Sequence, residues 1–269
     1  MKSRVITMFL LVILTLPSAA ETLVFGVVPQ QSAKKLAESW APMLAYLSAN
    51  SEIQIVFATA KDIPTFEKRL ANSEYDIAYM NPYHFVVFSE HNGYQALARQ
   101  KNKSIQGIIV VPKKSKIQSL ADLDGKTLAF PAPAAFAATI IPQSTLKSAG
   151  IMINTQYVSS HDSVYLTVSR EIFPAGGGVL RTLNATQDEA RNNLRILWKS
   201  PKYTPHAIAT AKSVSEASRN KLLHAMLQAN DDIAAETLLK GIAFKGFEPS
   251  KNEDWNDVRA LGINRIEAK

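Results

Sequence analysis

Several side chains with hydrogen-bonding groups stand where strands are expected to end. Tyr79, Asn81 and Tyr83 follow a short apolar run and offer phenol and amide groups, and Gln30 follows the first strand. Together they favour the binding of a small polar molecule or an anion. Asn81 followed by Pro82 is also a good turn and helix start, and Gln30 also suits an ordinary polar loop, so both interpretations stay open.

A second group of candidate ligand-binding residues lies further along the chain. Ser160 precedes an expected helix and suits an N-cap, while His161 binds an anion best when its ring is protonated. Arg181 follows three consecutive glycines, which permit close backbone approach or a positive φ. Its guanidinium suits a bidentate contact with an oxyanion. The alternatives are a capping or surface role for His161 and a surface position for Arg181.

The composition argues against catalysis, metal binding and nucleic-acid binding. The chain has no cysteine, and its five histidines are scattered without HExxH, GxSxG, Walker or GxGxxG patterns. We therefore expect no metal, no cofactor and no enzymatic activity. The net charge of +7 is spread over 30 basic and 23 acidic residues, which favours small anions over nucleic acid as partners.

Alternating strand and helix patterns must position these residues. Apolar runs alternate with helical spacing along most of the chain, and this order predicts an α/β fold with parallel strands. Strands are expected at 23–28, 53–59, 76–80, 95–99, 107–112, 128–130, 156–160, 194–199 and 206–211. Helices are expected at 33–49, 62–70, 82–90, 135–149, 163–170 and 215–239. Ligands bind such sheets where strands end and helices begin, here the loops at 29–32, 81–83, 131–136, 160–162 and 176–181.

Residues 1–20 have the pattern of a secretory signal peptide. Lys2 and Arg4 precede an apolar stretch at 5–16, and small residues at 18–20 follow it. The apolar stretch of about 12 residues is shorter than the roughly 20 that span a bilayer, with a retained membrane anchor as the alternative. We expect cleavage and export to the periplasm, which leaves +5 of the net charge of +7.

Five segments in a fixed order resemble the substrate-binding proteins of phosphate, phosphite and phosphonate ABC transporters. They are FGVVPQQSA at 25–33, YDIAYMNPY at 75–83, LADLDGKT at 120–127, SHDS at 160–163 and LWKSP at 197–201. The resemblance implies a two-lobed periplasmic binding protein type II fold with a two-strand hinge that closes on its ligand. It implies lobe 1 at 21–107 and 205–269, lobe 2 at 108–204, and hinge strands at 107–112 and 197–208.

The resemblance also implies a set of ligand-binding residues. In the family, a loop rich in Ser and Thr opens a helix of the second lobe, but the matching stretch APAAFAAT at 132–139 keeps only Thr139. Related proteins usually carry an acidic residue near Arg181. The loss of hydroxyls favours a ligand less charged or less oxygenated than phosphate, or partly apolar. The implied set is Gln30, Tyr79, Asn81, Tyr83, the backbone N–H groups of Ala134 and Ala135, Ser160, His161 and Arg181.

The function implied is capture of a small anion, a phosphonate- or phosphate-like oxyanion or a relative, between two lobes. The expected partner is an ABC permease. Presentation of the ligand to a membrane sensor histidine kinase is the alternative, since both roles share all the chemistry of the cleft. A monomer is expected, without nucleic acid as a partner.

Overall fold

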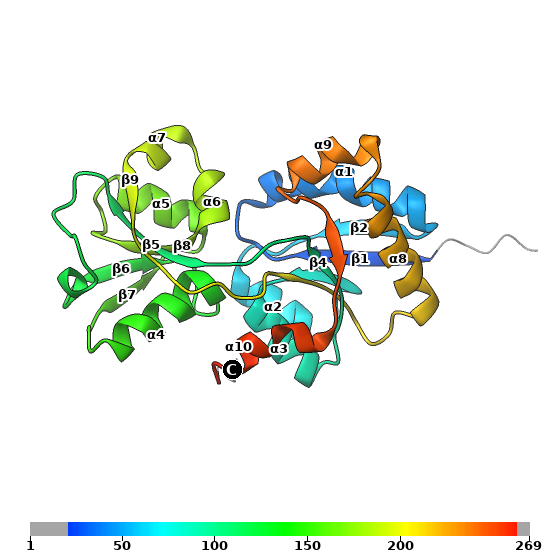
Figure 1. The fold of residues 1–269 in the computed structure, drawn as a ribbon, viewed down its shortest axis with the longest axis horizontal. Coiled ribbons are helices and arrows are strands. Elements are labelled where there is room, and N and C mark those ends of the chain that lie inside the picture. The colour runs from blue at the N-terminus through cyan, green and yellow to red at the C-terminus, as the bar shows by residue number, and fades with distance from the viewer. Residues whose placement is uncertain (1–20, 263–269) are drawn as a thin grey trace, which may run out of the picture.

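The computed structural model describes residues 21–262, which form two lobes, each built on its own β-sheet (Figure 1). The expected signal peptide at 1–20 lies outside the described residues. The first sheet has the order β2 (Gln54–Ala58), β1 (Thr22–Val27), β3 (Ile77–Met80), β10 (Ala207–Thr210), β4 (Gln95–Gln100) and β11 (Phe247–Pro249). The second has the order β7 (Asn154–Tyr157), β6 (Thr127–Phe130), β8 (Gly176–Val179), β5 (Gly107–Pro112) and β9 (Leu194–Lys199).

Helices cover both faces of each sheet (Figure 1). The helices of the first lobe are α1 (Ala33–Ser51), α2 (Ile63–Ala71), α3 (Pro82–His91), α8 (Glu216–Gln228), α9 (Ile233–Gly241) and α10 (Asn256–Arg259). Those of the second lobe are α4 (Ile141–Ser148), α5 (His161–Ser169), α6 (Leu180–Asn184) and α7 (Asp188–Asn192). A π-helix at Phe136–Ile140 leads into α4, and 3-10 turns lie at Ala121–Leu123 and Asn252–Trp255. Helical spacing in α1 buries Leu36, Trp40, Met43, Leu44 and Leu47, as expected for an amphipathic helix.

The sheets are mixed, whereas parallel strands were expected. β1 is parallel to β2 and β3, but β10 is antiparallel to β3 and β4. In the second sheet β6 is parallel to β7 and β8, and β5 is antiparallel to β8 and β9. The reason is that β5 and β10 enter their sheets from the opposite lobe. The carboxyl end of β1 points toward the second lobe (Figure 1), and so does that of β3, which is parallel to β1.

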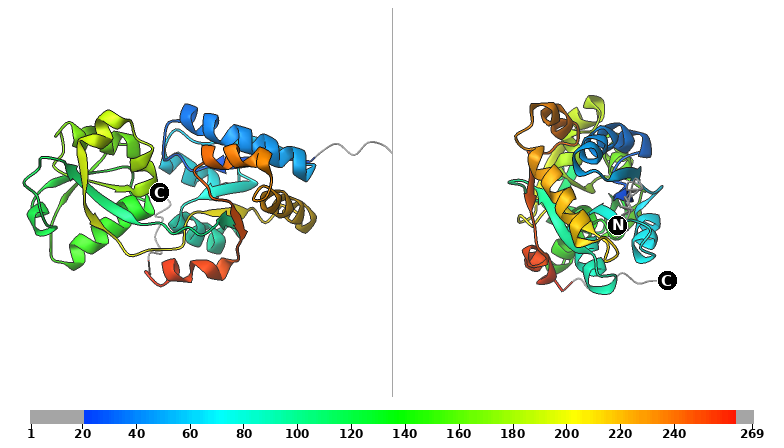
Figure 2. Two further views of the ribbon diagram at one scale, coloured as in Figure 1. Left: turned by 45° about the horizontal axis from the view of Figure 1, so that its top comes forward. Right: turned by 90° about the vertical axis from the view of Figure 1, so that its right-hand side faces the viewer.

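The chain crosses between the lobes twice, at 101–106 and at 200–206, as two adjacent segments (Figure 2). They are joined by an antiparallel bridge, in which Ile105 and Tyr203 exchange backbone N–H···O bonds of 2.9 and 3.0 Å. Residues 107–112, expected as a hinge strand, lie wholly inside the second sheet as β5. The chain crosses between the lobes in the mostly polar segment 101–106, directly before β5, and this segment has no alternation of apolar and polar residues that would predict a strand.

The glycine-rich segment at 176–181 was expected to be a loop, and this prediction is wrong. Gly176–Val179 form strand β8 between β5 and β6. A Cβ at Gly177 would lie 1.9 Å from the carbonyl oxygen of Ala138, and one at Gly178 would lie 2.3 Å from the Tyr165 hydroxyl. Glycine therefore lets the π-helix and α5 lie directly on opposite faces of this strand. Periodicity could not show the strand, because three of its four residues are glycines and so no side chains alternate along it.

Other elements also differ in their bounds from the sequence-based expectation, and the helical stretch expected at 215–239 is two helices, α8 and α9. The strand expected at 156–160 is β7, Asn154–Tyr157, and the helix expected from 163 begins at His161 because Ser160 caps it. The helix expected at 135–149 opens with the π-helix. Here the Ile140 N–H reaches back to the carbonyl of Ala135 at 3.4 Å.

The cap of α2 makes a testable contribution to stability. The Asp62 carboxylate accepts the Thr65 N–H at 2.8 Å, and its hydrogen bonds to Thr65 lower the pKa of Asp62. We expect Asp62→Ala to lower the free energy of unfolding by about 1 kcal/mol at pH 7, and Asp62→Asn to retain most of it. Because the folded pKa is depressed, the charge-dependent part is present above the unfolded pKa and is lost as the pH falls through the folded pKa. Urea unfolding at pH 7 and pH 3 tests this, and equal stability of the alanine variant at pH 7 contradicts it.

Candidate functional site

Two neighbouring cavities lie between the lobes and share Ile105, Val179 and His206 in their linings. The larger has a volume of about 190 Å³ and is lined by Tyr79, Gln100, Asn102, Lys103, Ser104, Ile105, Gln106, Val179, Leu180, Arg181, Pro205 and His206. The smaller has a volume of about 10 Å³, close to the size of one water. It is lined by Val28, Gln30, Ile63, Asn81, Ile105, Ala135, Phe136, Ala137, Ala138, His161, Val179 and His206. Both cavities therefore combine groups from the two lobes and the crossing segments.

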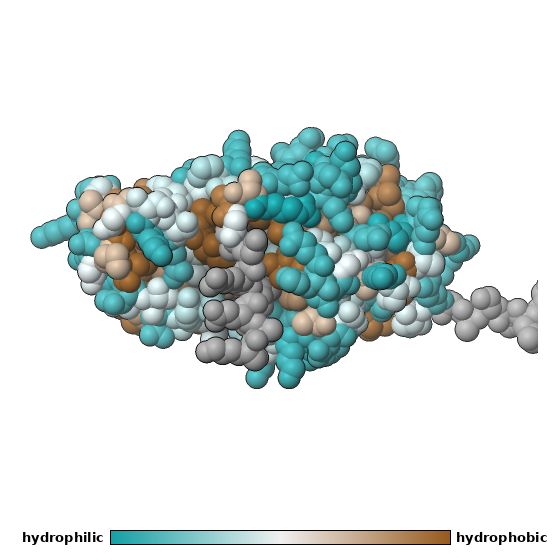
Figure 3. Space-filling model, turned by 90° about the horizontal axis from the view of Figure 1, so that it is seen from below, coloured by the Kyte–Doolittle hydropathy of each residue, from teal (hydrophilic) through white to brown (hydrophobic). Residues whose placement is uncertain are grey.

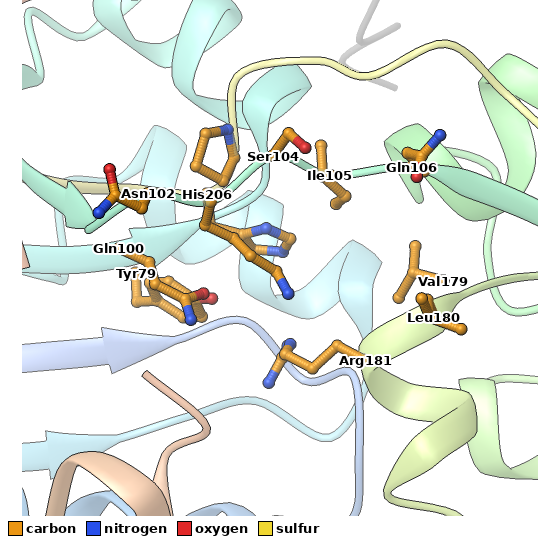
Figure 4. A pocket seen from close by; sticks show the side chains of 12 residues that line it. Tyr79, Gln100, Asn102, Ser104, Ile105, Gln106, Val179, Leu180, Arg181 and His206 are labelled. Carbon is orange, nitrogen blue, oxygen red and sulfur yellow. The ribbon is translucent and has the colours of Figure 1, made fainter. Parts of the chain in front are cut away.

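Arg181 supplies the positive charge that the sequence predicted. It lies in α6 directly after β8, and its side chain extends from the second lobe toward Tyr79 and His206 (Figure 4). Its Nη2 donates to the Oε1 of Gln30 in the first lobe. Among residues 21–262, no aspartate or glutamate lines either cavity, so the guanidinium has no counter-charge in these linings. A guanidinium has five N–H donors, and the bond to Gln30 leaves others for an anion.

Tyr79 and His206 form one wall of the larger cavity. Their rings stack with centroids 5.0 Å apart and an interplanar angle of 24°, and both side chains are buried. Burial raises the pKa of Tyr79, so its hydroxyl stays protonated and can donate. Burial, with Arg181 next in importance, lowers the pKa of His206 well below its ordinary value. Tyr79 is therefore both a buried residue of the first lobe and part of the cavity lining.

Asn81 has the helix-start role that the sequence allowed, and it also lines the smaller cavity. Its Oδ1 accepts the His84 N–H at 2.8 Å and so caps α3, while its Nδ2 donates to the carbonyl of Ala134 at 3.1 Å. The first contact is local, and the second joins the two lobes beside the smaller cavity, which Asn81 lines. Asn81 therefore couples the start of a helix in one lobe to the loop before a helix in the other.

His161 is buried beside the smaller cavity. Its Nδ1 lies 3.1 Å from the Thr182 hydroxyl, which lies 2.8 Å from the hydroxyl of Tyr165. Burial, with a smaller effect of Arg181, lowers the pKa of His161 to about 3. The ring is therefore neutral near pH 7, whereas the sequence suggested binding through a protonated ring. Thr182 engages Nδ1, which leaves Nε2 as the ring nitrogen available to a ligand.

Ala134 and Ala135, whose backbone donors were expected at the site, lie differently in the structure. The N–H of Ala135 donates to the carbonyl of Ala132 at 3.2 Å, while Ala134, whose carbonyl accepts from Asn81, lines neither cavity. The donors at this place belong instead to the next residues, Phe136 to Ala138, because the first N–H groups of a helix have no partner within it. Ala135 and these three residues do line the smaller cavity.

Ser160 and Tyr83 line neither cavity. The Ser160 Oγ accepts the Ser163 N–H at 3.1 Å and so caps α5. Tyr83 is buried beside His84, with ring centroids 6.2 Å apart, and burial together with nearby Glu67 raises its pKa to about 12. The cavities thus bring together Gln30, Tyr79, Asn81, Ala135, His161 and Arg181 from the predicted set. Ser160 and Tyr83 support the elements that carry the cavity residues.

Sequence reasoning missed the contribution of the crossing segments. Lys103 was counted only among the 30 basic residues, and His206 only as one of five scattered histidines. The signal that could have found them is their place in the connections between lobes, since a cleft must lie beside these connections. Within residues 21–262, there is no group of three His, Asp or Glu side chains that could hold a metal ion.

Two α/β lobes that are joined by two crossing segments and enclose a cavity are the arrangement of type II periplasmic binding proteins. The family described as ABC transporter, phosphonate, periplasmic substrate-binding protein has a sequence model that matches residues 25–255. The chain belongs to this family. Its members are substrate-binding transport proteins and not enzymes, and the family and fold expected from the sequence are confirmed.

Known proteins resemble the chain over nearly its whole length. It is 23% identical to the phosphonates-binding periplasmic protein of Escherichia coli strain K12, over 96% of this chain and 82% of the relative. A binding component of an ABC phosphonate transporter from Pseudomonas aeruginosa superposes with a TM-score of 0.83 at 17% identity, covering 93% of this chain and 91% of that one. A Prochlorococcus marinus protein solved with methylphosphonate superposes with a TM-score of 0.82 at 16% identity, covering 90% and 97%. At these identities the structures show a shared fold.

Proposed function

We propose that the protein captures a small phosphonate-like oxyanion between its lobes and delivers it to an ABC permease. The observation that carries the proposal is Arg181, whose guanidinium borders a cavity without acidic side chains in its described lining. A mobile anion is the natural counter-ion for a charge in this position, because a partly buried charge needs a partner. Family membership supports the same ligand chemistry.

The size and walls of the larger cavity indicate what kind of anion fits. Its volume of about 190 Å³ is smaller than the roughly 300–1,000 Å³ of pockets for drug-sized ligands. Val179 and Leu180 supply apolar side chains on the side of the cavity away from Tyr79, and Ile105 adds a further apolar side chain beside His206 (Figure 4). This combination favours an oxyanion that carries a small alkyl group, and methylphosphonate has that chemistry.

Closure of the lobes should contribute to affinity, because each lobe holds part of the site. Arg181 donates to Gln30, Asn81 donates to Ala134, and the Lys35 Nζ donates to the Ala185 carbonyl at 2.8 Å. We assign lobe 1 to 21–106 and 205–262 and lobe 2 to 107–204, one residue earlier than the expected boundary because Gly107 belongs to β5 of the second sheet. An anion that contacts both Arg181 and the first lobe binds the closed state more tightly than the open state, and it therefore stabilises the closed state.

The proposed route to the periplasm is export through a cleaved signal peptide at 1–20. No helix within residues 21–262 combines the length and the apolar character needed to cross a bilayer. On the face shown in Figure 3, hydrophobic residues form small, separate patches within a largely hydrophilic surface. We propose that the mature chain works as a monomer.

An anion panel tests the proposed ligand class directly. Purified residues 21–269, shown to be free of bound ligand, would be heated with methylphosphonate, phosphite, phosphate, sulfate, nitrate and arsenite. A ligand at 100 times its Kd adds about 2.7 kcal/mol of stability, and we expect the largest shift with a phosphonate or phosphite. No shift with any anion would sink the oxyanion proposal.

The sensor role shares the same cleft and needs a separate experiment. Uptake of the anion identified by the panel would be compared between cells with and without this protein. Loss of uptake supports the transport role. Unchanged uptake together with loss of an anion-dependent histidine kinase response supports ligand presentation to a sensor instead.

A further inference from the structure

His206 carries a buried nitrogen with no partner at the centre of the cleft. It ends the second crossing segment directly before β10, lines both cavities and is 4% exposed. Its Nε2 has no hydrogen-bond partner within residues 21–262. Leaving a buried polar atom unpaired is unfavourable, so this atom indicates that a partner from outside the chain belongs here.

The groups around His206 are neutral or positive. Tyr79 of β3 stacks on its ring, and the positive charge of Arg181 opposes protonation of His206, with smaller effects from His84 and His161 at a pH where those rings carry a proton. The His161 ring itself is neutral near pH 7. Lys103 of the first crossing segment lines the same larger cavity, as does the neutral Gln100 of β4. The carboxylate of Glu67 lies 3.1 Å from the His84 Nε2 and lines neither cavity. Among the described residues, a protonated His206 therefore has no counter-charge in the linings of the cavities.

We infer that His206 is a ligand-binding residue that takes up one proton from solvent as the anion enters the cleft, so that protonation and anion binding are coupled. This inference rests on the proposed function and adds a residue and a pH response to it. The bound anion supplies the missing counter-charge and accepts a hydrogen bond from the imidazolium. Nothing is oxidised or reduced: the imidazole gains one proton and the solvent loses one.

The sign of the pH response follows from the surroundings of His206. Burial and Arg181 hold the pKa of His206 low in the ligand-free protein, and a bound anion raises it. Proton uptake then occurs at a pH between the two pKa values, and affinity rises as the pH falls through this window. One coupled proton gives at most about a tenfold change in Kd per pH unit.

Calorimetry of the mature protein in two buffers of different ionisation enthalpy measures the protons taken up. Wild type, His206→Gln and the control His224→Gln would be titrated with methylphosphonate and, separately, with inorganic phosphate. Ionisation of the ligand itself is common to all three proteins, so the difference between them isolates His206. We expect wild type and His224→Gln to take up as much as one more proton per ligand than His206→Gln. We also expect His206→Gln to bind about tenfold more weakly, or worse, near the lower end of the window.

Wild type alone provides a second test, which is independent of how well the variant folds. Carbon-13 labelling of histidine rings reports protonation by NMR, and one buried ring should change from neutral to protonated when methylphosphonate is added. Binding without such a change, and with equal proton uptake in wild type and His206→Gln, would overturn the inference while leaving the proposed function intact. Absence of binding to every anion in wild type would overturn both.

Discussion

Arg181→Ala is expected to weaken binding of the anion identified by the panel by about 30-fold to several thousand-fold. Truncating one partner of a buried, hydrogen-bonded charge pair costs about 2–5 kcal/mol, and here the guanidinium borders a cavity whose described lining contains no acid. Isothermal titration calorimetry at fixed pH and salt measures the weaker binding. The free energy of unfolding without ligand should change little, because the side chain lies at the cleft and its hydrogen bond to Gln30 joins the lobes rather than the interior of either one.

Two further variants make the Arg181 experiment specific. Arg170→Ala removes an arginine at the end of α5 that lines neither cavity, so it serves as the matched control and should keep wild-type affinity. Arg181→Lys keeps the charge but loses the planar, bidentate fork, and it should bind with intermediate affinity. Wild-type affinity in Arg181→Ala would remove Arg181 from the site, even if an anion still binds elsewhere in the cleft.

Gly177→Ala is expected to destabilise the protein by about 3 kcal/mol or more, since the neighbours of its new Cβ are backbone and a packed ring. That Cβ would lie 1.9 Å from the Ala138 carbonyl oxygen and 2.6 Å from the Phe130 ring. Either β8 or the π-helix must move. Because β8 leads directly into the helix that carries Arg181, anion affinity should fall as well. Denaturant unfolding and the anion panel measure the two effects.

Gly241→Ala is the matched control for the steric argument. The nearest atom to a Cβ at Gly241 is the Ser39 carbonyl oxygen at 3.9 Å, an ordinary contact. Gly241 lies in the last turn of α9 without a positive φ, so alanine should be neutral or slightly stabilising there. If Gly177→Ala unfolds at the same denaturant concentration as this control, close packing against β8 is not the reason for the glycine.

Much of the order of elements could be predicted because its causes are local. The side chains of Asp62 and Ser160 accept hydrogen bonds from the N–H groups of Thr65 and Ser163, three residues later in the chain. The apolar spacing that predicts α1 lies entirely within the residues of that helix. Strand β8 was missed for an equally local reason. A strand of glycines carries no alternating side chains, and its stability comes from the elements that pack on both of its faces.

The candidate site was predicted in part, and the errors have a common cause. Resemblance and position placed Gln30, Asn81, His161 and Arg181 beside the cavities, but they also included Ser160, which caps a helix. Position in a loop after a strand does not say which way a side chain points. His206 was passed over because a lone histidine in a connecting segment has no pattern around it.

By itself, the sequence determined the alternation of strands and helices, the helix caps and the family, because each depends on neighbouring residues or on an ordered set of segments. Only the tertiary structure decided which distant groups meet. Arg181 reaches Gln30 across 151 positions of the chain, and Tyr79 of β3 stacks on His206, which directly precedes the neighbouring antiparallel strand. These contacts form where the two lobes meet, beside the two segments that connect them. The Arg181 guanidinium without an acidic neighbour in the cavity linings, and the unpaired Nε2 of His206, are also results of this packing. Which polar groups become buried depends on residues far apart in the chain, so no local segment of the sequence encodes it.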